Sequence, residues 1–316
     1  MPLTLADLFA SPDHYLHRFD GDAAVFVPMD RAAYQRSIFL DARIAPAATQ
    51  EMRLPVAALV DPPRAPATAW IFHVAHCGST LLARALDDAG ASLVLREPQA
   101  LRQAAVTGDA TRLALAAAMI GRRYRADSPT LVKANVPVNF VLPTLRAFDP
   151  EARAILLYLP LDDYVLAVLR SAPHRDWLRR VTTQLAPHLG DLSACSDAQR
   201  AAALWHAQMD RFADAVRTMP GARTLDAERF HADPAVVLKA AAAHLGPPID
   251  GEVLERTASG PLFATYSKNP GVAFDNDARL ARRDELRRTL ADEVAVAREW
   301  RGNAASLPTV SDAALV

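Results

Sequence analysis

The sequence has few cysteines, no long apolar segment and no excess of charge of either sign. Its 2 cysteines, Cys77 and Cys195, are far apart and lack neighbouring metal-ligand residues, which argues against a disulfide framework and a zinc knuckle. No segment approaches the roughly 18 uncharged apolar residues of a membrane span, and the charged N-terminal residues do not resemble a signal peptide. These absences predict a cytoplasmic protein without a membrane partner.

The charges of the chain are balanced. Lys and Arg together number 35, against 36 Asp and Glu, which leaves a formal net charge of −1. Because there is no overall basic excess, the composition predicts no nucleic-acid partner, and any anionic ligand must be held by a local group of cations. Hydrophobic residues make up 51% of the 316 residues. This is enough for a substantial core in one large α/β domain or two small ones.

Short apolar segments alternate with helical patterns from Thr68 onward, as a parallel sheet with helical crossovers requires. The predicted strands span 70–74, 92–95, 130–132, 154–158 and 223–225. The predicted helices span 79–90, 109–124, 137–148, 161–171, 197–218, 233–245 and 279–300. The pattern therefore predicts a three-layer α/β fold of the P-loop type, with a central, mostly parallel sheet flanked by helices.

Three parts of the chain are expected from the same pattern. Residues 1–67 form an N-terminal extension or cap, with a short helix near its start, a strand at 24–29, a helix from Arg31, and a Pro- and Ala-rich linker over 46–68. Residues 68–302 form the main domain. Residues 303–316 form a flexible C-terminal tail.

Residues 70–86, WIFHVAHCGSTLLARAL, predict a strand, a tight loop and a helix. The first turn of such a helix directs unpaired backbone N–H groups and the positive end of its dipole into the loop. Gly78 allows an anion to approach the main chain closely, and the hydroxyls of Ser79 and Thr80 are further donors. The segment predicts a site for a phosphate-like group, and its alternative is an ordinary strand, turn and helix without a ligand.

The same loop lacks the residues that a nucleotide triphosphatase requires. In G-x-x-x-x-G-K-[S/T], the lysine reaches the outer phosphates and the hydroxyl holds magnesium. When Gly78 is taken as the second glycine, Ser79 stands at the lysine position and His73 at the first glycine. The sequence therefore argues against ATP or GTP hydrolysis by the usual route.

The loop, His76-Cys77-Gly78-Ser79-Thr80-Leu81-Leu82, resembles the 5′-phosphosulfate loop of the sulfotransferase family, R/K-S-G-S/T-T-L-L. Segments at 131–134, 148–157, 225–246 and 266–270 resemble further motifs of that family in the same order. The resemblance is to a divergent, bacterial-type member. It implies that PAPS (3′-phosphoadenosine 5′-phosphosulfate) donates a sulfuryl group to a hydroxyl or amine of a small molecule or carbohydrate.

The resemblance also implies a set of donor-binding residues. These are His76, Cys77, Gly78, Ser79, Thr80, Leu81, Arg170, Ser171 and Lys268, and the candidates to replace the family's phosphate ligands are Lys268, Arg170 and Arg175. The alternative for the arginines at 170, 175, 179 and 180 is a solvated helix face. Two departures from the family stand out. Tyr158 occupies the place of the arginine that binds the 3′-phosphate, with Ser171 further along than the usual serine, and His76 replaces the loop's usual Arg or Lys. Protonation of His76 beside a bound polyanion would restore that positive charge.

The predicted catalytic residues are Glu97, His76 and Lys133, with no metal. Glu97 follows a strand at the carboxyl edge of the sheet, where open α/β sheets bind ligands, and similar sulfotransferases use a Glu there as the base. Its alternatives are His73 and His76 as bases, or a surface ion pair between Glu97 and Arg96. Lys133 is either a charge-stabilising donor or a surface lysine, and Cys77 a reactive thiol or a small packing residue.

Three functions remain open from the sequence. The first is a PAPS-dependent sulfotransferase. The second is a nucleotide-binding protein of the same fold whose catalysis is lost or altered, which the missing arginine favours. The third is a small-molecule kinase of the P-loop type, against which the missing lysine argues. A homodimer is also open.

Overall fold

The computed structural model describes residues 3–63, 67–90, 92–300 and 313–316. Its centre is a sheet of five parallel strands in the order β5-β6-β4-β7-β8. The strands are β4 (Thr68–His73), β5 (Val94–Arg96), β6 (Thr130–Lys133), β7 (Arg153–Tyr158) and β8 (Ala222–Asp226). All five were predicted, with bounds that differ by one or two residues. The predicted α/β fold with a central parallel sheet is confirmed.

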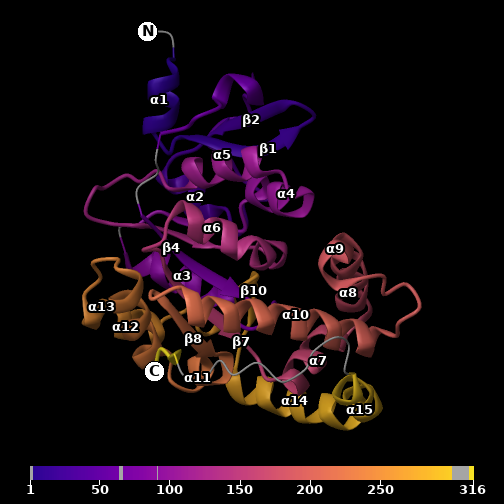
Figure 1. Cartoon of the computed structure of the whole chain (residues 1–316). Coiled ribbons are helices and arrows are strands. Elements are labelled where there is room, and N and C mark those ends of the chain that lie inside the picture. The colour runs from indigo at the N-terminus through magenta and orange to yellow at the C-terminus, as the bar shows by residue number, and fades with distance from the viewer. Residues whose placement is uncertain (1–2, 64–66, 91, 301–312) are drawn as a thin grey trace.

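Helices cover both faces of this sheet (Figure 1). On one face, α3 (Ser79–Ala89), α12 (Pro234–Leu245) and α13 (Gly251–Ala258) contact one another. On the other, η2 (Val136–Val141), α6 (Leu142–Phe148) and α10 (Asp197–Thr218) pack together. The remaining helices of the main domain are α4 (Gln99–Thr107), α5 (Ala110–Ile120), α7 (Leu161–Leu169), α8 (Ala172–Gln184), α9 (Ala186–Leu189), α11 (Ala227–Ala232), α14 (Asn276–Thr289) and α15 (Ala291–Glu299).

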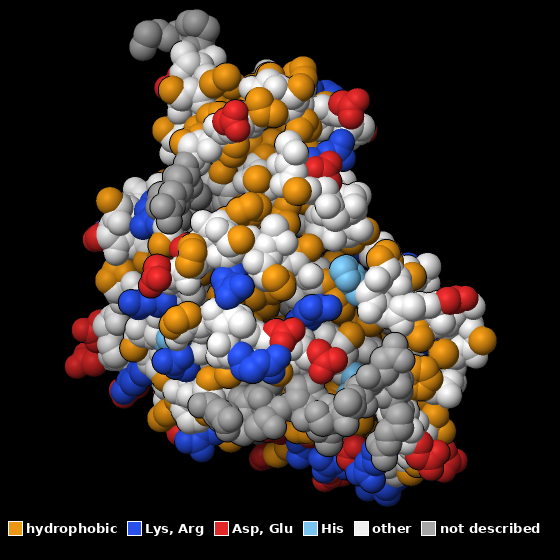
Figure 2. Space-filling view, in the orientation of Figure 1, with side chains coloured by type: hydrophobic (Ala, Val, Ile, Leu, Met, Phe, Trp, Pro, Cys, Tyr) orange, Lys and Arg blue, Asp and Glu red, His pale blue; other side chains and the backbone are white. Residues whose placement is uncertain are grey.

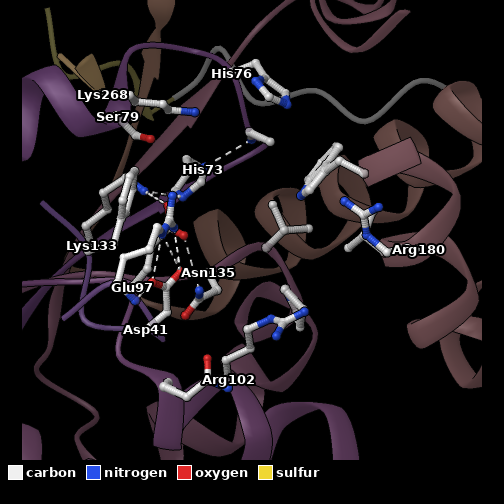
Figure 3. A pocket seen from close by; sticks show the side chains of 18 residues that line it. Asp41, His73, His76, Ser79, Glu97, Arg102, Lys133, Asn135, Arg180 and Lys268 are labelled. Atoms are coloured by element: carbon white, nitrogen blue, oxygen red, sulfur yellow. Dashed lines mark hydrogen bonds and ion pairs between the residues drawn. The ribbon is translucent and has the colours of Figure 1, made fainter. Parts of the chain in front are cut away.

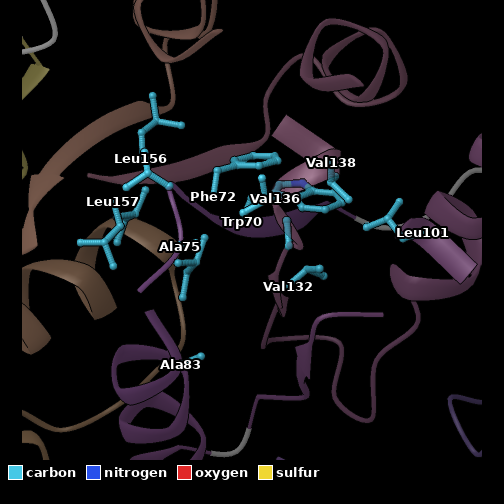
Figure 4. Close-up of a cluster of buried hydrophobic side chains, with 14 of the residues drawn as sticks. Trp70, Phe72, Ala75, Ala83, Leu101, Val132, Val136, Val138, Leu156 and Leu157 are labelled. Atoms are coloured by element: carbon cyan, nitrogen blue, oxygen red, sulfur yellow. The ribbon is translucent and has the colours of Figure 1, made fainter. Parts of the chain in front are cut away.

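Strand β4 is held in the middle of the core, and all six of its residues are buried. Trp70 and Phe72 lie on one face of the strand, because they are two residues apart, and their rings stack with centroids 5.4 Å apart. The core cluster around them includes Val136 and Val138 of η2 (Figure 4). This packing fixes the point at which the loop after β4 begins.

Several predicted helices differ from the observed ones for local reasons. The predicted helix over 137–148 begins as the 3-10 helix η2, and Pro143 lies in the first turn of α6, where a missing N–H costs least. The predicted helix over 161–171 ends at Leu169, and α8, which was not predicted, follows it. The predicted helix over 279–300 is two helices, because Leu290 leaves the helical conformation and buries its side chain.

The N-terminal residues form a separate antiparallel sheet. Its strands are β1 (His14–Asp20), β2 (Ala23–Pro28) and β3 (Met52–Pro55), accompanied by α1 (Leu5–Ala10), α2 (Arg31–Arg36) and η1 (Val56–Leu59). Strand β1 was not predicted, and the predicted linker over 46–68 contains β3 and η1. A small hairpin, β9 (Thr265–Tyr266) and β10 (Asn269–Ala273), lies near the other end of the chain.

Arg96 joins the N-terminal segment to the central sheet. Its side chain is 1% exposed; it pairs with Asp87 and donates to four carbonyl oxygens between Tyr34 and Ile38. The alternative of a surface ion pair between Arg96 and Glu97 is therefore wrong. Since Leu40 N–H also donates to the Arg96 carbonyl at 2.8 Å, residues 34–40 are fixed against the end of β5.

The last residues of the chain lie beside an edge strand. Ala314 pairs with Thr224 of β8, and the Leu315 N–H donates to the Thr224 carbonyl at 2.8 Å. Most of the predicted tail, 303–316, lies outside the described residues, but its final residues are held against the sheet. None of the described helices has both the length and the apolarity needed to cross a membrane. Basic and acidic side chains are intermixed on the face seen in Figure 2, as the balanced composition implies.

Candidate functional site

A cavity of about 350 Å³ lies at the carboxyl ends of β4, β5 and β6. The loop after a parallel strand is where open α/β sheets bind ligands, so this position agrees with the sequence-based expectation. Segments far apart in the sequence contribute its walls (Figure 3). The lining residues are Phe39, Asp41, Arg43, His73, Ala75, His76, Ser79, Glu97, Gln99, Arg102, Lys133, Asn135, Val136, Pro137, Trp177, Arg180, Val181 and Lys268.

The loop between β4 and α3 has an unusual backbone. Ala75, His76 and Gly78 all adopt positive φ, at 80°, 52° and 81°. A left-handed conformation is uncommon for residues other than glycine, and such residues concentrate at functional sites. Gly78 is the N-cap of α3, where no side chain caps the helix. The first turn of α3 thus begins without a side-chain cap beside the cavity.

Gly78 is required for more than the approach of an anion. Besides its positive φ, a Cβ built on it would lie 3.0 Å from the Nε2 atom of His231. A side chain at this position would both strain the backbone and displace His231. Substitution of Gly78 would therefore disturb the loop itself, which makes it a poor test of ligand binding.

Two side chains of the loop have buried polar atoms that find no hydrogen-bond partner among the residues that the structure describes. These are both ring nitrogens of His76 and the Oγ1 atom of Thr80. Leaving a buried polar group unpaired costs about 1–3 kcal/mol, so proteins seldom retain one without a reason. Ser79, next to them, lines the cavity. This arrangement fits a ligand that supplies hydrogen-bonding oxygens to the loop.

His76 is neutral in this environment. Its ring lies 4.7 Å from that of His174 and contacts Trp177 edge to face at 5.0 Å. Burial, followed by the charges of Lys268 and Arg170, holds the pKa of His76 well below its usual value. The expected protonation of His76 beside a bound polyanion stays a prediction, because the lowered pKa describes the protein without that anion.

Glu97 and Lys133 form a buried ion pair at the base of the cavity. Lys133 is 1% exposed and its Nζ donates to Glu97 Oε1, which rules out the reading of Lys133 as a surface lysine. Asn135 Nδ2 donates to the other oxygen, Oε2, at 3.3 Å. Burial alone would raise the pKa of Glu97, but Lys133 overcomes this and keeps it below its usual range. Burial lowers the pKa of Lys133, and Glu97 opposes that shift.

His73 lies beside this pair, with its Nε2 atom 3.1 Å from Lys133 Nζ. The Ala75 backbone N–H donates to His73 Nδ1 at 3.0 Å, so the ring proton must be on Nε2, which donates to the Ala134 carbonyl at 2.8 Å. Burial and the Lys133 charge hold the pKa of His73 well below its usual value. Both ring nitrogens are thus engaged, and His73 is removed as a rival to Glu97.

Lys268 comes from the hairpin between β9 and β10 and lies beside the loop. It lines the main cavity and a second one of about 120 Å³ on the other side of the loop, together with Gly78, Thr80 and Leu81. Within the described residues, its ammonium group makes no hydrogen bond or ion pair. Lys268 is therefore a cation available to a ligand bound at the loop.

Arg170 lies beside the loop, whereas Ser171 is occupied elsewhere. Arg170 Nε donates to His174 Nε2 at 2.9 Å, so His174 carries its proton on Nδ1 and donates it to Ser171 Oγ at 2.6 Å. Burial lowers the pKa of His174 to about 4, which keeps this ring neutral. Arg175 forms ion pairs with Asp197 and Glu293, so it does not serve as the alternative phosphate ligand.

Cys77 is a packing residue. It is 1% exposed, its Sγ lies 3.9 Å from the Leu157 carbonyl oxygen, and burial raises the pKa of its thiol. A thiol that stays protonated is a poor nucleophile, so the reactive alternative is excluded.

A third cavity, of about 140 Å³, adjoins the loop between α7, α11 and α14. Its floor includes Leu159 and Leu166, and four arginines surround it: Arg170, Arg279, Arg282 and Arg283. Arg279 and Arg283 both bind the carboxylate of Glu228. Helix α14 was not predicted to be part of the site, because its arginine-rich sequence is typical of a helix exposed to solvent.

Other site residues were also missed. Asn135 follows Lys133 by two residues at the same strand end, and that proximity was a usable signal. Asp41 and Arg43, which bind each other and line the cavity, come from the N-terminal segment. No local pattern marks them, since only the fold brings that segment to the sheet. No three His, Cys, Asp or Glu side chains within the described ranges are grouped so as to hold a metal.

No family model matches the chain, and no curated protein matches it. Among solved structures, a sulfotransferase domain from the curacin biosynthetic pathway is similar, with a TM-score of 0.42 and 14% identity over 67% of this chain and 84% of that chain. A likeness of this degree concerns the fold alone, and the function has to be argued from the site.

Proposed function

We propose that this protein is a sulfotransferase that moves a sulfuryl group from PAPS to a hydroxyl or amine. The observation that carries the proposal is the position of Glu97. Its ionised carboxylate lines the same cavity as the Ser79 hydroxyl and Lys268. A base for the acceptor and donors for an oxyanion therefore face one space, as in-line group transfer requires.

The loop would hold the phosphosulfate end of the donor. Buried Thr80 Oγ1, cavity-lining Ser79 and the nearby Lys268 supply hydrogen-bond donors and one positive charge there. Bound PAPS supplies the activated sulfuryl group. Arg170, which lines both smaller cavities beside the loop, is placed to bind a phosphate as well.

The 3′-phosphate end departs from the family's pattern. Tyr158, at the family's arginine position, ends β7 and carries no charge. A different arginine, Arg282, lines the third cavity. Its guanidinium group forms an ion pair with the exposed Glu285 at 3.5 Å. An exposed pair of this kind contributes little, so Arg282 is free to exchange its partner for a phosphate.

The chain's own groups account for the proton and the charge. Glu97 accepts the proton of the acceptor hydroxyl, while Lys133 and Asn135 orient its carboxylate. Because its pKa is lowered, Glu97 is ionised at neutral pH, which is the state that a general base needs. Lys268 and the hydroxyls of the loop stabilise the negative charge that develops on the transferred group.

A second function is a nucleotide-binding protein without transfer activity. The observation in its favour is that both oxygens of the Glu97 carboxylate already accept a hydrogen bond, Oε1 from Lys133 and Oε2 from Asn135. The kinase alternative has less support, because Ser79 stands where the phosphate-binding lysine of a P-loop would be.

Calorimetric titration with PAP (the desulfated donor), ATP and magnesium, and GTP distinguishes the three. Binding of PAP, followed by transfer from labelled PAPS to a panel of hydroxyl acceptors, supports the proposal. Binding of PAP without transfer to any acceptor favours the second function. Magnesium-dependent binding of ATP with no affinity for PAP would overturn the proposal in favour of a kinase.

A further inference from the structure

The cavity beside Glu97 carries more positive charge than its carboxylates balance. Five lysine and arginine side chains line it, against the two carboxylates of Asp41 and Glu97. Asp41 is bound by Arg43, and Glu97 by Lys133. The cations left over are Arg102, Arg180 and Lys268.

These three cations fall into two groups. Lys268 lies at the loop, since it also lines the smaller cavity with Gly78 and Thr80. Arg180 lies across the main cavity from Glu97 and Lys133, and Arg102 lies on a wall away from the loop (Figure 3). An anion held at the loop leaves Arg102 and Arg180 without an acidic partner among the described residues. The cavity is therefore built to receive a second negative charge.

Arg180 differs from two neighbouring arginines on α8 in its ion pairs. Arg175 and Arg179 both form ion pairs with Asp197. Arg180 forms no hydrogen bond or ion pair with any residue that the structure describes. Arg102 donates to a neutral amide oxygen, Gln184 Oε1, at 2.7 Å, and to no carboxylate in the described chain.

Apolar side chains line the same cavity as these arginines and Glu97. Trp177 and Val181 come from the same face of α8 as Arg180, and Val136 and Pro137 from the start of η2. A volume of about 350 Å³ is in the range of small-molecule sites. The lining thus matches a molecule with an apolar body between two polar ends.

We infer that the acceptor is a small hydroxylated molecule with an anionic group, a carboxylate or a phosphate, which Arg102 and Arg180 bind while the hydroxyl faces Glu97. The inference rests on the proposed function, which makes this cavity the acceptor site. Guanidinium groups bind either anion with paired, charge-assisted hydrogen bonds.

Three phenols of similar size test this inference. They are 4-hydroxyphenylacetate, 4-hydroxybenzylphosphonate and the neutral alcohol 2-(4-hydroxyphenyl)ethanol, each titrated calorimetrically with and without PAP. We expect at least one anion to bind about tenfold or more tightly than the alcohol. The carboxylate and the phosphonate together show which anion is preferred.

The arginines are tested by Arg180→Gln and Arg102→Gln, with Arg179→Gln as the matched control on the same helix. Each cavity variant is expected to weaken anion binding about tenfold and leave the alcohol unchanged, whereas the control changes neither. Equal affinity for all three phenols, no binding of either anion, or an anion preference that survives both cavity variants would overturn the inference.

The same data separate this inference from the proposed function. Arginine-dependent anion binding in a protein that neither binds PAP nor transfers sulfate keeps the anion site and removes the sulfotransferase. Binding of PAP and transfer to the neutral alcohol as efficiently as to the anions keeps the sulfotransferase and removes the anion site.

Discussion

Glu97 and Lys133 are joined both by their side chains and by their backbones. The Lys133 ammonium donates to the Glu97 carboxylate, and the Glu97 N–H donates to the Lys133 carbonyl at 2.8 Å. Glu97 itself has a positive φ of 58°, a conformation that costs about 1–3 kcal/mol outside glycine. The surrounding contacts hold this residue in a strained position at the end of β5, where its carboxylate faces the cavity.

We expect Glu97→Gln to lower kcat about 10²–10⁴-fold while leaving the affinity for PAP nearly unchanged. The amide retains an acceptor for Lys133 but cannot take a proton from the substrate. Transfer from labelled PAPS and calorimetric titration with PAP measure the two quantities. Glu51→Gln, which alters an exposed ion pair with Arg18, is the control. Full activity in Glu97→Gln would remove Glu97 as the base.

Lys133→Met is expected to destabilise the protein by about 3–5 kcal/mol, because it leaves the Glu97 charge buried and unpaired. The double variant Glu97→Gln with Lys133→Met is expected to recover much of that loss, since no lone charge remains. Urea unfolding of the wild type, both single variants and the double variant gives the coupling energy. Strictly additive effects would show that the ion pair does not govern stability here.

Thr80→Val is expected to change stability and binding in opposite directions. Its buried hydroxyl has no hydrogen-bond partner within the described part of the chain, so replacing it with a methyl group of similar size is expected to raise the free energy of unfolding by about 1 kcal/mol. The same change is expected to weaken PAP binding, because a donor at the loop is lost. Thermal unfolding and calorimetry measure both. A variant that is destabilised but binds PAP normally would contradict the assignment of Thr80 to the ligand.

Arg96→Met is expected to destabilise the protein by about 3–5 kcal/mol. The change leaves the Asp87 carboxylate and several carbonyl oxygens without the guanidinium that binds them. Arg53→Met, at an exposed ion pair with Asp20, is the matched control and is expected to change stability by less than about 0.5 kcal/mol. Urea unfolding compares the two, and equal effects would show that Arg96 does not anchor the N-terminal segment.

Acid is expected to destabilise the protein in two pH ranges. The pKa values of His174 and His231 are both lowered to about 4, chiefly by burial, and those of His73 and His76 are lowered as well. Below about pH 6.5 these histidines bind protons in the unfolded chain but stay neutral in the folded protein. The free energy of unfolding therefore falls as the pH drops from about 6.5 toward 4.

Glu97 affects the free energy of unfolding in a lower pH range. Its folded pKa is depressed, so its contribution is complete above about pH 4.5 and is lost as the pH falls through the folded value. Urea unfolding at pH 7, 6, 5 and 4 measures the first range, and the difference between wild type and Glu97→Gln below pH 4.5 measures the second. A free energy of unfolding that stays constant between pH 7 and 5 would contradict the neutral, buried state of the histidines.

Local sequence patterns were sufficient to predict the bounds of some helices but not the presence of others. The helix over 197–218 was predicted with the bounds observed for α10, and in the structure Ser196 and Gln199 form a capping box at its start. Helix α8 was missed because its periodicity is interrupted by charged residues. Their ion-pair partners, such as Asp197 and Glu293, lie far along the chain.

The sequence alone determined the parallel α/β fold and the loop that begins α3. Strand periodicity, glycine at a left-handed position and the start of a helix are local properties of the chain. The tertiary structure alone decided which charges reach the cavity and in what state. Lys133 is buried, and the pKa of His76 is lowered. Arg180 lines the cavity and has no acidic partner among the described residues. These states depend on solvent exclusion and on neighbours from distant segments, and no local pattern records either.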